Sequence, residues 1–501
     1  MTTYQGIIRQ NMVGNHYING SFICNKNSES FDSINPATGE VVGTFPEASI
    51  PEVESAYQFA RDSFQGWRKY SRVKRAEYFL TLANLVEQRR EEIAEAITLE
   101  TGKVFNESIA EVNEALHMAQ YAFSTGKMPY GEALASELPE KDAYMLRKPK
   151  GVVAIVAPFN FPFAIGGFWC AAPALVEGNT VILKPSEDTP LVGEITAELF
   201  NDAGFPPGVF NLVHGDGRVG NGLIRQDVDH VCFTGSAEVG MHIRKVCAES
   251  WHKTCSCEMG SKSAVIIHED ANYEMAMAAC LASAYKLSGQ RCVSASRLIV
   301  HRSLYDKFAD EFANRSGDLK TGNPFLKDTF YGPLINKKQL DRVVWFNKMV
   351  AADPEANVLL MGEQVEDSLF LTPTVYQTEW RDVPYLKQEV FGPHVSIIPY
   401  DTIDDAIRIY NDTDYGLALG VVTENFKVAR RIRNECDFGL GYWNGGSIAA
   451  ESHLGFGGVK KSGNGQPSAA RTFRAVTHEV SWTVNHGDSL NFPQGMKAGT
   501  E

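Results

Sequence analysis

The sequence predicts an α/β protein built around a parallel sheet, followed in the chain by a second α/β domain. Three observations carry this prediction. Short β-branched runs that end in Gly or Pro alternate with helix-compatible segments, as they do in parallel-sheet domains. The same alternation starts again after Glu258. The chain has 501 residues, which is too long for one hydrophobic core, so two or three domains are expected.

The predicted elements follow a regular order. Apolar residues over 50–125 are mainly at helical spacing, with charged faces between them. Four predicted strands come next, at residues 151–158, 179–185, 208–215 and 229–235, with a predicted helix at 191–204. In the second domain, residues 263–270 predict a strand, and residues 296–312 predict a strand that leads into a helix.

Two further stretches, residues 143–150 and 477–486, have the alternating pattern of amphipathic strands. They lie outside the two α/β units. Strands in such positions could form an edge that pairs between subunits.

Composition excludes several classes of protein. Hydrophobic residues make up 44% and charged residues 22%, which is ordinary for a globular chain, and no apolar run reaches the ~18–20 residues that cross a bilayer. The first 15 residues lack the apolar core of a signal peptide. A net charge of −14 gives no reason to expect nucleic acid or an anionic membrane as a partner. We therefore expect a soluble protein without either partner.

The cysteines indicate a reducing compartment, and we expect a cytoplasmic protein. There are nine, an odd number at low density, which argues against a disulfide scaffold. Cys255 and Cys257, with His252 nearby, suggest a metal site only weakly, because the C-x-C spacing lacks a second pair of ligands. We expect no bound metal.

Two glycine loops compete as the nucleotide site. Gly215, Gly217 and Gly220 form a G-x-G-x-x-G directly after a predicted strand, but no acidic residue ends a strand ~20 residues later. The other loop, FTGSAEVG at 233–240, places a Ser at a predicted helix start, where free amides can bind a pyrophosphate. Each loop also has an ordinary explanation, as a turn or as a capped helix.

Several strings, in order, resemble the aldehyde dehydrogenase superfamily. They are APFNFPF (157–163), NTVILKPSEDTP (179–190), FTGSAEVG (233–240), CEMGSKSAVII (257–267), SGQRC (288–292), EVFGP (389–393), WNGG (443–446) and GFGGVKKSG (455–463). The resemblance extends from about Asn35 to the C-terminus. It implies the aldehyde dehydrogenase fold: a parallel-sheet dinucleotide-binding domain, an α/β catalytic domain and a small oligomerisation strand pair.

The resemblance also implies where the domains lie. The cofactor domain would comprise residues 1–128 and 150–257, and the catalytic domain residues 258–467. Residues 129–149 and 468–487 would form the oligomerisation strands, and 488–501 a C-terminal tail. A homodimer or homotetramer would result.

The implied reaction is oxidation of a small aldehyde to its carboxylic acid. In the family a thiolate attacks the carbonyl, because a free aldehyde is a poor hydride donor, and Cys292 matches this nucleophile. Asn160 matches the side chain that stabilises the oxyanion, together with the Cys292 backbone N–H. Glu258 matches the base that activates water to hydrolyse the thioester. Arg291, beside the nucleophile, could favour its thiolate form.

The cofactor implied is NAD(P). The matching positions are Lys184, Ser186 and Glu187 near the adenosine ribose, Gly235, Ser236 and Gly240 at the pyrophosphate, and Glu389 and Phe391 at the nicotinamide end. Glu187 could accept the 2′-hydroxyl of NAD and would repel the 2′-phosphate of NADP. NAD is therefore favoured.

The expected substrate pocket contains Phe161, Ile165, Phe168, Arg291, Val293 and Phe456. The C-terminal tail weakly resembles that of the aminoadipate-semialdehyde branch, so Arg291, Lys460 and Lys461 are candidate anchors for a substrate carboxylate. Clustered aromatic residues around Asn160 favour an apolar tunnel instead.

The chain departs from the family pattern at Phe159, where Trp is usual, at Ser261, where Gly is usual, and at Gln466-Pro467, where Arg-Glu is usual. The last departure is expected to change the start of the following helix and the substrate entrance.

Two rival functions remain. A CoA-acylating semialdehyde dehydrogenase would pass its thioester to CoA, but that branch typically lacks the base at the Glu258 position. A non-catalytic binding protein on the same fold would usually lose the nucleophile, whereas Cys292, Glu258 and Asn160 are all present.

Overall fold

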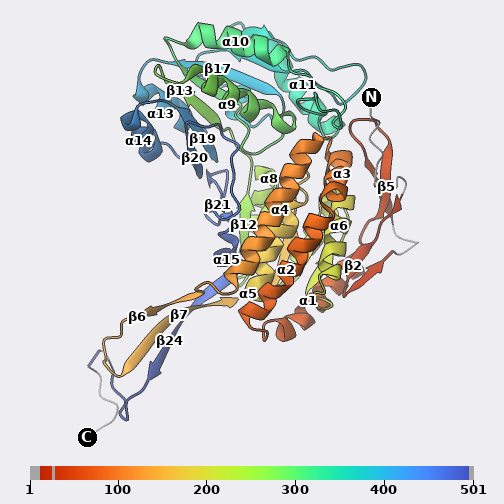
Figure 1. The fold of residues 1–501 in the computed structure, drawn as a ribbon, viewed down its shortest axis with the longest axis vertical. Coiled ribbons are helices and arrows are strands. Elements are labelled where there is room, and N and C mark those ends of the chain that lie inside the picture. The colour runs from red at the N-terminus through yellow and green to blue at the C-terminus, as the bar shows by residue number, and fades with distance from the viewer. Residues whose placement is uncertain (1–11, 25–28, 493, 496–501) are drawn as a thin grey trace.

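The computed structural model describes residues 12–24, 29–492 and 494–495, and it contains two large mixed sheets and a projecting arm. Figure 1 shows the two sheets in separate bodies, one above the other, with the arm extending away from the lower body. Among the described residues, no helix is long and apolar enough to cross a membrane.

The first sheet has seven strands, and five consecutive members, from the edge strand inward, are parallel. In spatial order they are β12 (Thr254–Glu258), β11 (His230–Thr234), β8 (Val152–Val156), β9 (Thr180–Lys184), β10 (Phe210–Leu212), β2 (His16–Ile18) and β3 (Ser21–Ile23). The four strands predicted from β-branched runs are β8, β9, β10 and β11, and all four predictions are confirmed. The antiparallel pair β2 and β3 comes from the N-terminal segment, for which the sequence predicted no strand.

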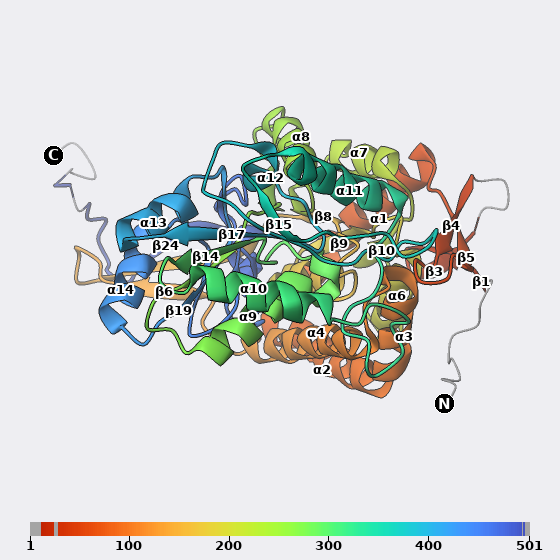
Figure 2. The same cartoon turned by 90° about the horizontal axis from the view of Figure 1, so that it is seen from above.

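Helices cover both faces of this sheet, with α7 and α8 on one side and α2 and α4 on the other (Figure 2). The helices are α1 (Ile50–Trp67), α2 (Arg72–Gln88), α3 (Arg90–Thr101), α4 (Phe105–Thr125), α5 (Ala172–Glu177), α6 (Pro190–Asp202), α7 (Gly217–Arg225) and α8 (Ala237–Ala248). The helical segments predicted over 50–125 and 191–204 are thus confirmed. A π-helix, η1 (Ala164–Ala171), follows β8 and was not predicted. A three-stranded sheet of β1 (Met12–Val13), β5 (Val41–Pro46) and β4 (Ser30–Ile34) flanks this body.

The second sheet also has seven strands, which are parallel except for one edge strand. Their order is β15 (Asn357–Leu360), β16 (Thr374–Gln377), β17 (His394–Tyr400), β14 (Arg297–His301), β13 (Ala264–Ile267), β19 (Ala418–Val422) and β20 (Leu440–Trp443). Its helices are α9 (Tyr273–Tyr285), α10 (Tyr305–Gly317), α11 (Lys337–Ala352), α12 (Pro384–Lys387), α13 (Ile403–Asn411) and α14 (Phe426–Glu435). The predicted strands at 263–270 and 296–312, and the helix after the latter, are confirmed.

The arm is a three-stranded antiparallel sheet in the order β24 (Thr477–Asn485), β7 (Lys141–Pro149) and β6 (Gly131–Leu134). The two predicted outlying strands correspond to β7 and β24, which pair along their whole length. In Figure 1 the arm extends well beyond the helices of the lower body.

Short strands connect the two bodies. Strand β21 (Gly455–Phe456) pairs with β23 (Ser468–Ala469), β18 (Tyr415–Gly416) pairs with β22 (Val459–Lys460), and helix α15 (Thr472–Ala475) leads into β24. Gln466 and Pro467 therefore precede a short strand and not a helix.

Candidate active site

One edge of the first sheet gathers most of the predicted site residues. Strands β8, β9, β11 and β12 are parallel, so the residues that follow them share the carboxyl edge, which is where α/β sheets bind ligands. Asn160 follows β8, Glu187 follows β9, Ser236 follows β11, and Glu258 is the last residue of β12. Their spacing in sequence is large, and the parallel sheet alone brings them together.

Cys292 reaches this edge from the second body, on a loop with an unusual backbone. The preceding 3₁₀ turn, η2 (Lys286–Gly289), holds Leu287 and Ser288 at φ of 54° and 56°, a left-handed conformation that costs non-glycine residues about 1–3 kcal/mol each. A Cβ at Gly289 would lie 2.4 Å from the Gly392 carbonyl oxygen, so only glycine fits there. The Asn160 amide donates a 2.9 Å hydrogen bond to the Gln290 carbonyl, which joins the two bodies beside Cys292.

A cavity of about 860 Å³ lies between the bodies. Eight predicted site residues line it: Asn160, Ser186, Glu187, Gly235, Ser236, Cys292, Glu389 and Phe391. Other lining residues were not predicted, because no sequence motif marks them. They come from loops, from strand β18 and from helix α11, and include Met259, Asn336, Lys338, Gln339, Arg342 and Tyr415. The cavity therefore joins the predicted nucleophile and oxyanion donor to the predicted cofactor residues.

Glu258 is buried, with 4% of its surface exposed. The backbone N–H groups of Gly458 and Ser468 donate to its carboxyl group, while Oε2 has no hydrogen-bond partner. Burial nevertheless dominates and raises the pKa of Glu258 well above its ordinary value. The carboxyl group is tightly enclosed, because a Cβ at Gly457 would lie 2.8 Å from its Oε1 and 2.9 Å from Pro467. Pro467, one of the departures from the family pattern, thus packs beside the candidate base.

The Cys292 thiol is not activated by Arg291, contrary to expectation. Burial raises the pKa of Cys292 to about 12, and the negative charges of Glu389 and Glu258 add to this shift. The Arg291 guanidinium instead forms a 2.8 Å ion pair with Glu107 on α4, and it lies 5.2 Å from the centre of the Phe161 ring. A base must therefore remove the thiol proton before Cys292 can attack a carbonyl.

Ser261 links the nucleophile to Glu389. Its backbone N–H donates a 2.7 Å hydrogen bond to Glu389, and its hydroxyl donates to the Cys292 carbonyl oxygen. Burial raises the pKa of Glu389 to about 7, and the Ser261 amide opposes that shift. Ser261 stands where the family usually has Gly, and its hydroxyl holds the Cys292 backbone through this hydrogen bond.

A smaller pocket of about 250 Å³ adjoins the cavity, and both glycine loops line it. Gly217 and Gly220 of one loop and Gly235 and Ser236 of the other are among its lining residues. Each loop starts a helix: Asp216 caps α7, and the Ser236 hydroxyl accepts a 3.3 Å hydrogen bond from the Val239 amide in α8. The two candidate nucleotide loops therefore line one and the same pocket.

Lys184 ties the end of β9 to the first of these loops. It is buried, and its Nζ donates hydrogen bonds to the carbonyl oxygens of Pro185 (2.6 Å) and Gly215 (2.7 Å). Glu187 lies 3.7 Å away with half of its side chain exposed, so its carboxylate faces open space at the pocket. A dinucleotide needs groups that bind its pyrophosphate and its ribose. The pocket offers the amides at the start of α8, an enclosed lysine and an accessible carboxylate.

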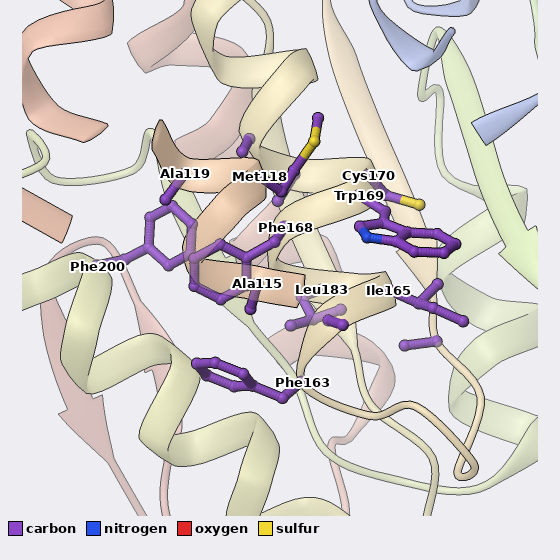
Figure 3. Close-up of a cluster of buried hydrophobic side chains, with 14 of the residues drawn as sticks. Ala115, Met118, Ala119, Phe163, Ile165, Phe168, Trp169, Cys170, Leu183 and Phe200 are labelled. Carbon is purple, nitrogen blue, oxygen red and sulfur yellow. The ribbon is translucent and has the colours of Figure 1, made fainter. Parts of the chain in front are cut away.

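Phe168, expected in the substrate pocket, lies in the hydrophobic core. Its side chain is fully buried, with its ring centre 4.8 Å from that of Phe163 and 6.3 Å from that of Phe200. Figure 3 shows Phe168 among α4 side chains and Phe163, within the core. Its neighbour Trp169 packs on Phe456 instead, at 5.1 Å between ring centres. The π-helix places these consecutive residues on different faces, and helical periodicity in the sequence cannot reveal such a turn.

The other expected pocket residues are also enclosed. Ile165, Val293 and Phe456 are each less than 9% exposed, and none of them lines the described cavity. Lys460 and Lys461 do not reach Cys292 as anchors, because Lys460 pairs with Asp437 at 2.9 Å and Lys461 with Asp414. Arg291 is therefore the remaining candidate anchor. Among the residues that the structure describes, no group of His, Cys, Asp and Glu is arranged to hold a metal ion.

Comparison with known proteins decides the family. The model of the aldehyde dehydrogenase family matches residues 23–481. The chain belongs to the aldehyde dehydrogenase family. An α-ketoglutaric semialdehyde dehydrogenase of Bacillus subtilis (strain 168) is 34% identical over 471 residues, which are 91% of this chain and 96% of the relative. An aldehyde dehydrogenase of Davidiella tassiana is 33% identical over 478 residues, covering 95% and 96%.

Solved structures agree with this assignment of the fold. An aldehyde dehydrogenase from Bacillus cereus superposes with a TM-score of 0.90 at 32% identity, covering 94% of this chain and 96% of that one. A betaine aldehyde dehydrogenase from Staphylococcus aureus, solved with NAD⁺, has a TM-score of 0.90 at 31% identity, covering 95% and 97%. This aldehyde dehydrogenase is therefore an NAD(P)-dependent enzyme that oxidises an aldehyde to the acid.

Proposed function

We propose that Cys292, Asn160 and Glu258 perform the oxidation in this aldehyde dehydrogenase, as nucleophile, oxyanion donor and base. The observation that supports this most is their convergence: Asn160 and Cys292 line one cavity, and the buried Glu258 lies close enough for its charge to raise the pKa of Cys292. The direct test is NADH formation from an aldehyde without CoA. If NADH accumulated only when CoA was added, an acylating enzyme would be indicated instead.

Each residue has a role that follows from its surroundings. Cys292, once deprotonated, attacks the aldehyde carbon, and the carbonyl oxygen becomes an oxyanion. Asn160 uses one amide N–H for Gln290, so its second N–H is free to stabilise this oxyanion with the Cys292 backbone N–H. Bound NAD⁺ supplies the hydride acceptor. Glu258, when ionised, removes a proton from the water that hydrolyses the resulting thioester at Cys292.

Cofactor choice is proposed to depend on Glu187. Its exposed carboxylate would accept a hydrogen bond from the 2′-hydroxyl of NAD and repel the 2′-phosphate of NADP. We expect a higher kcat/KM with NAD, and we expect Glu187→Ser to narrow or invert the preference. The ratio of kcat/KM for the two cofactors measures this, with the exposed Glu238→Ser at the same cavity as control. A wild-type preference for NADP would refute the proposal, and an unchanged ratio in Glu187→Ser would show that this carboxylate does not contact the ribose.

The substrate is proposed to be an aldehyde with a carboxylate at its far end. Arg291 is largely buried, next to Cys292, and uses one guanidinium nitrogen for Glu107 while its Nε has no partner. A buried donor without a partner costs free energy that a substrate carboxylate would recover. We expect succinic, glutamic or aminoadipic semialdehyde to exceed hexanal and benzaldehyde in kcat/KM by roughly ten- to a hundredfold.

Arg291→Gln tests the anchor directly. The variant should lose the preference for semialdehydes and keep its activity on hexanal, so the ratio of the two kcat/KM values is decisive. Lys461→Gln is the matched control, because its charge is paired with Asp414 away from the cavity. Better turnover of hexanal or benzaldehyde than of every semialdehyde by the wild type would exclude the anchor and favour an apolar tunnel.

The arm is proposed to assemble the chain into a homodimer or homotetramer. Strand β24 pairs with β7 on one side only, and Trp482 on β24 is 60% exposed. A long strand with a free edge and an exposed indole is a natural pairing surface between copies. Light scattering should give two or four times the chain mass, and Trp482→Glu should lower it. Trp345 on α11 is also more than half exposed, and Trp345→Glu should leave the mass unchanged, whereas a monomeric wild type would contradict the proposal.

A reducing compartment such as the cytoplasm is proposed for this enzyme. All nine cysteines are free thiols in the structure, including the exposed Cys24. Free thiols persist where glutathione and thioredoxin keep them reduced.

A further inference from the structure

Three cysteines meet where helix α8 packs on strand β12. Cys247 lies in the last turn of α8, and Cys255 and Cys257 are alternate residues of β12, so both point to the α8 side of the strand. The side chains of Cys247 and Cys257 both interact electrostatically with that of Cys255. The Cys247 thiol donates a 3.9 Å hydrogen bond to the Thr254 carbonyl oxygen, and the Cys257 thiol donates one of 3.9 Å to the Gly240 carbonyl oxygen.

The central sulfur has the surroundings of a reactive thiolate. Interaction with the neighbouring thiols of Cys247 and Cys257 lowers the pKa of Cys255, and the positive charges of Arg244 and Lys150 lower it further. The Asn464 side-chain amide donates to the same sulfur at 3.6 Å. Cys255 is partly exposed, whereas Cys247 and Cys257 are buried. Low pKa together with solvent access distinguishes redox-reactive cysteines from structural ones.

We propose that Cys255 is a hydroperoxide-reactive site whose oxidation ends in a disulfide with Cys247. Cys247 is the better partner because it approaches from the adjacent helix. Cys257 sits two residues along the same strand, where Cα atoms are about 6.5–7 Å apart and at the limit for a disulfide. The proposal stands independently of the residue roles assigned above.

The chemistry balances with the hydroperoxide as the only co-reactant. The Cys255 thiolate attacks one peroxide oxygen, the O–O bond breaks, and the other oxygen leaves as an alcohol or water after taking up a proton. This step leaves Cys255 as a sulfenic acid. The Cys247 sulfur then attacks the Cys255 sulfur, the S–O bond breaks, and the hydroxide leaves as water with the proton of the Cys247 thiol. Two thiols lose two electrons, which reduce the peroxide.

The site lies beside the catalytic residues without including them. Cys255 is three residues before Glu258 on β12, and α8 begins at Ser236. Asn464 accepts from the Cys257 amide and donates to the Cys255 carbonyl, so it fastens the same strand to the loop after β22. A Cys247–Cys255 bond would therefore tie the helix that starts at the cofactor pocket to the strand that ends in the candidate base.

The chain supplies its own control pair. The side chains of Cys170 and Cys232 also interact electrostatically with each other, but both residues are less than 5% exposed, and burial contributes to a pKa of Cys232 well above its ordinary value. Proximity alone would let this pair oxidise as readily as Cys247 and Cys255. Because Cys232 lacks the lowered pKa of Cys255, and neither residue of the pair has the solvent access of Cys255, we expect this pair to oxidise more slowly.

The experiment treats the full-length enzyme with hydrogen peroxide, alkylates the remaining thiols and digests it with trypsin without reduction. Cleavage at Lys245, Lys253 and Lys262 separates Cys247, in peptide 246–253, from Cys255 and Cys257, in peptide 254–262. We expect these two peptides joined by a reducible bond, formed at least about tenfold faster than any bond between Cys170 and Cys232. A disulfide within 254–262, or equal oxidation of the buried pair, would overturn the proposal. Cys292 falls in a different peptide, so its oxidation is scored separately.

Two variants test whether Cys247 is the residue that forms the disulfide with Cys255. In Cys247→Ser, peroxide should leave Cys255 as a sulfenic acid that dimedone traps, with no joined peptides. In Cys257→Ser, the joined peptides should still form, because Cys257 only lowers the pKa of Cys255. A disulfide within peptide 254–262 in Cys247→Ser in place of the trapped sulfenic acid, or loss of the joined peptides in Cys257→Ser, would refute the assignment. Thermal unfolding of the untreated variants shows whether both remain folded.

Discussion

Cys292→Ala is expected to abolish aldehyde oxidation while NAD binding persists. Without the sulfur, no covalent adduct can form, and removing a catalytic nucleophile typically costs a factor of about 10³–10⁶ in turnover. The substitution removes one atom from a loop whose shape depends on Gly289, Gln290 and the left-handed turn before them, so the cavity should keep its form. NADH production measures the activity, and fluorescence titration measures NAD binding.

Cys436→Ala is the matched control for this experiment. Cys436 is a buried thiol of the same body that lies outside the described cavity. Its replacement should leave turnover within about twofold, as expected for a small change away from the site. Substantial turnover by Cys292→Ala would remove Cys292 from the mechanism.

Glu258→Gln is expected to form one equivalent of NADH and then stall as an acyl-enzyme. The glutamine keeps the shape of the side chain but cannot take a proton from water, and loss of a general base costs about 10²–10⁴-fold. Rapid mixing separates the burst of NADH from the steady rate, and mass spectrometry detects the acyl group on Cys292. Loss of the burst as well would mean that Glu258 also deprotonates the Cys292 thiol, whose pKa of about 12 requires a base.

Glu258 is also expected to determine how the steady rate depends on pH. A raised pKa means that Glu258 binds a proton more readily than an ordinary carboxylic acid, so its basic form is lost as the pH falls through that pKa. The steady rate of the wild type should therefore rise with pH across the titration of Glu258. The remaining rate of Glu258→Gln should not follow this titration, and an identical pH profile in both proteins would exclude Glu258 as the base.

Local sequence patterns predicted most of the strands and helices. The runs that became β8, β9 and β11 end in Gly or Pro and alternate with helices, and parallel pairing then fixed their common edge. The N-terminal strands β2 and β3 escaped prediction because each has only three residues. They pair with each other as a short hairpin, and only Tyr17 is registered with a distant strand, at Leu212 of β10. The π-helix escaped because its extra residue per turn leaves no distinctive composition.

Site residues that belong to a recognisable motif could be predicted from the sequence. Contacts between side chains of different elements could not. Asn160 and Cys292 were identified from their strings and share the cavity as expected. The Glu107–Arg291 ion pair joins residues 184 positions apart, and no local pattern connects them. Phe168 was placed in the pocket because aromatic residues cluster in sequence there, but clustering does not specify which face of a helix a ring occupies.

The arm constrains how the chain can be synthesised. Met145 on β7 and Ser481 on β24 touch across the arm, although they are 336 residues apart. A ribosome adds about 5–20 residues per second, so β7 emerges roughly 17–67 seconds before its partner. During that interval β7 has only the short β6 beside it, and its other edge is open to neighbouring nascent chains. The slowest and most aggregation-sensitive stage of biogenesis should therefore be the closure of this arm, after both large sheets have been translated.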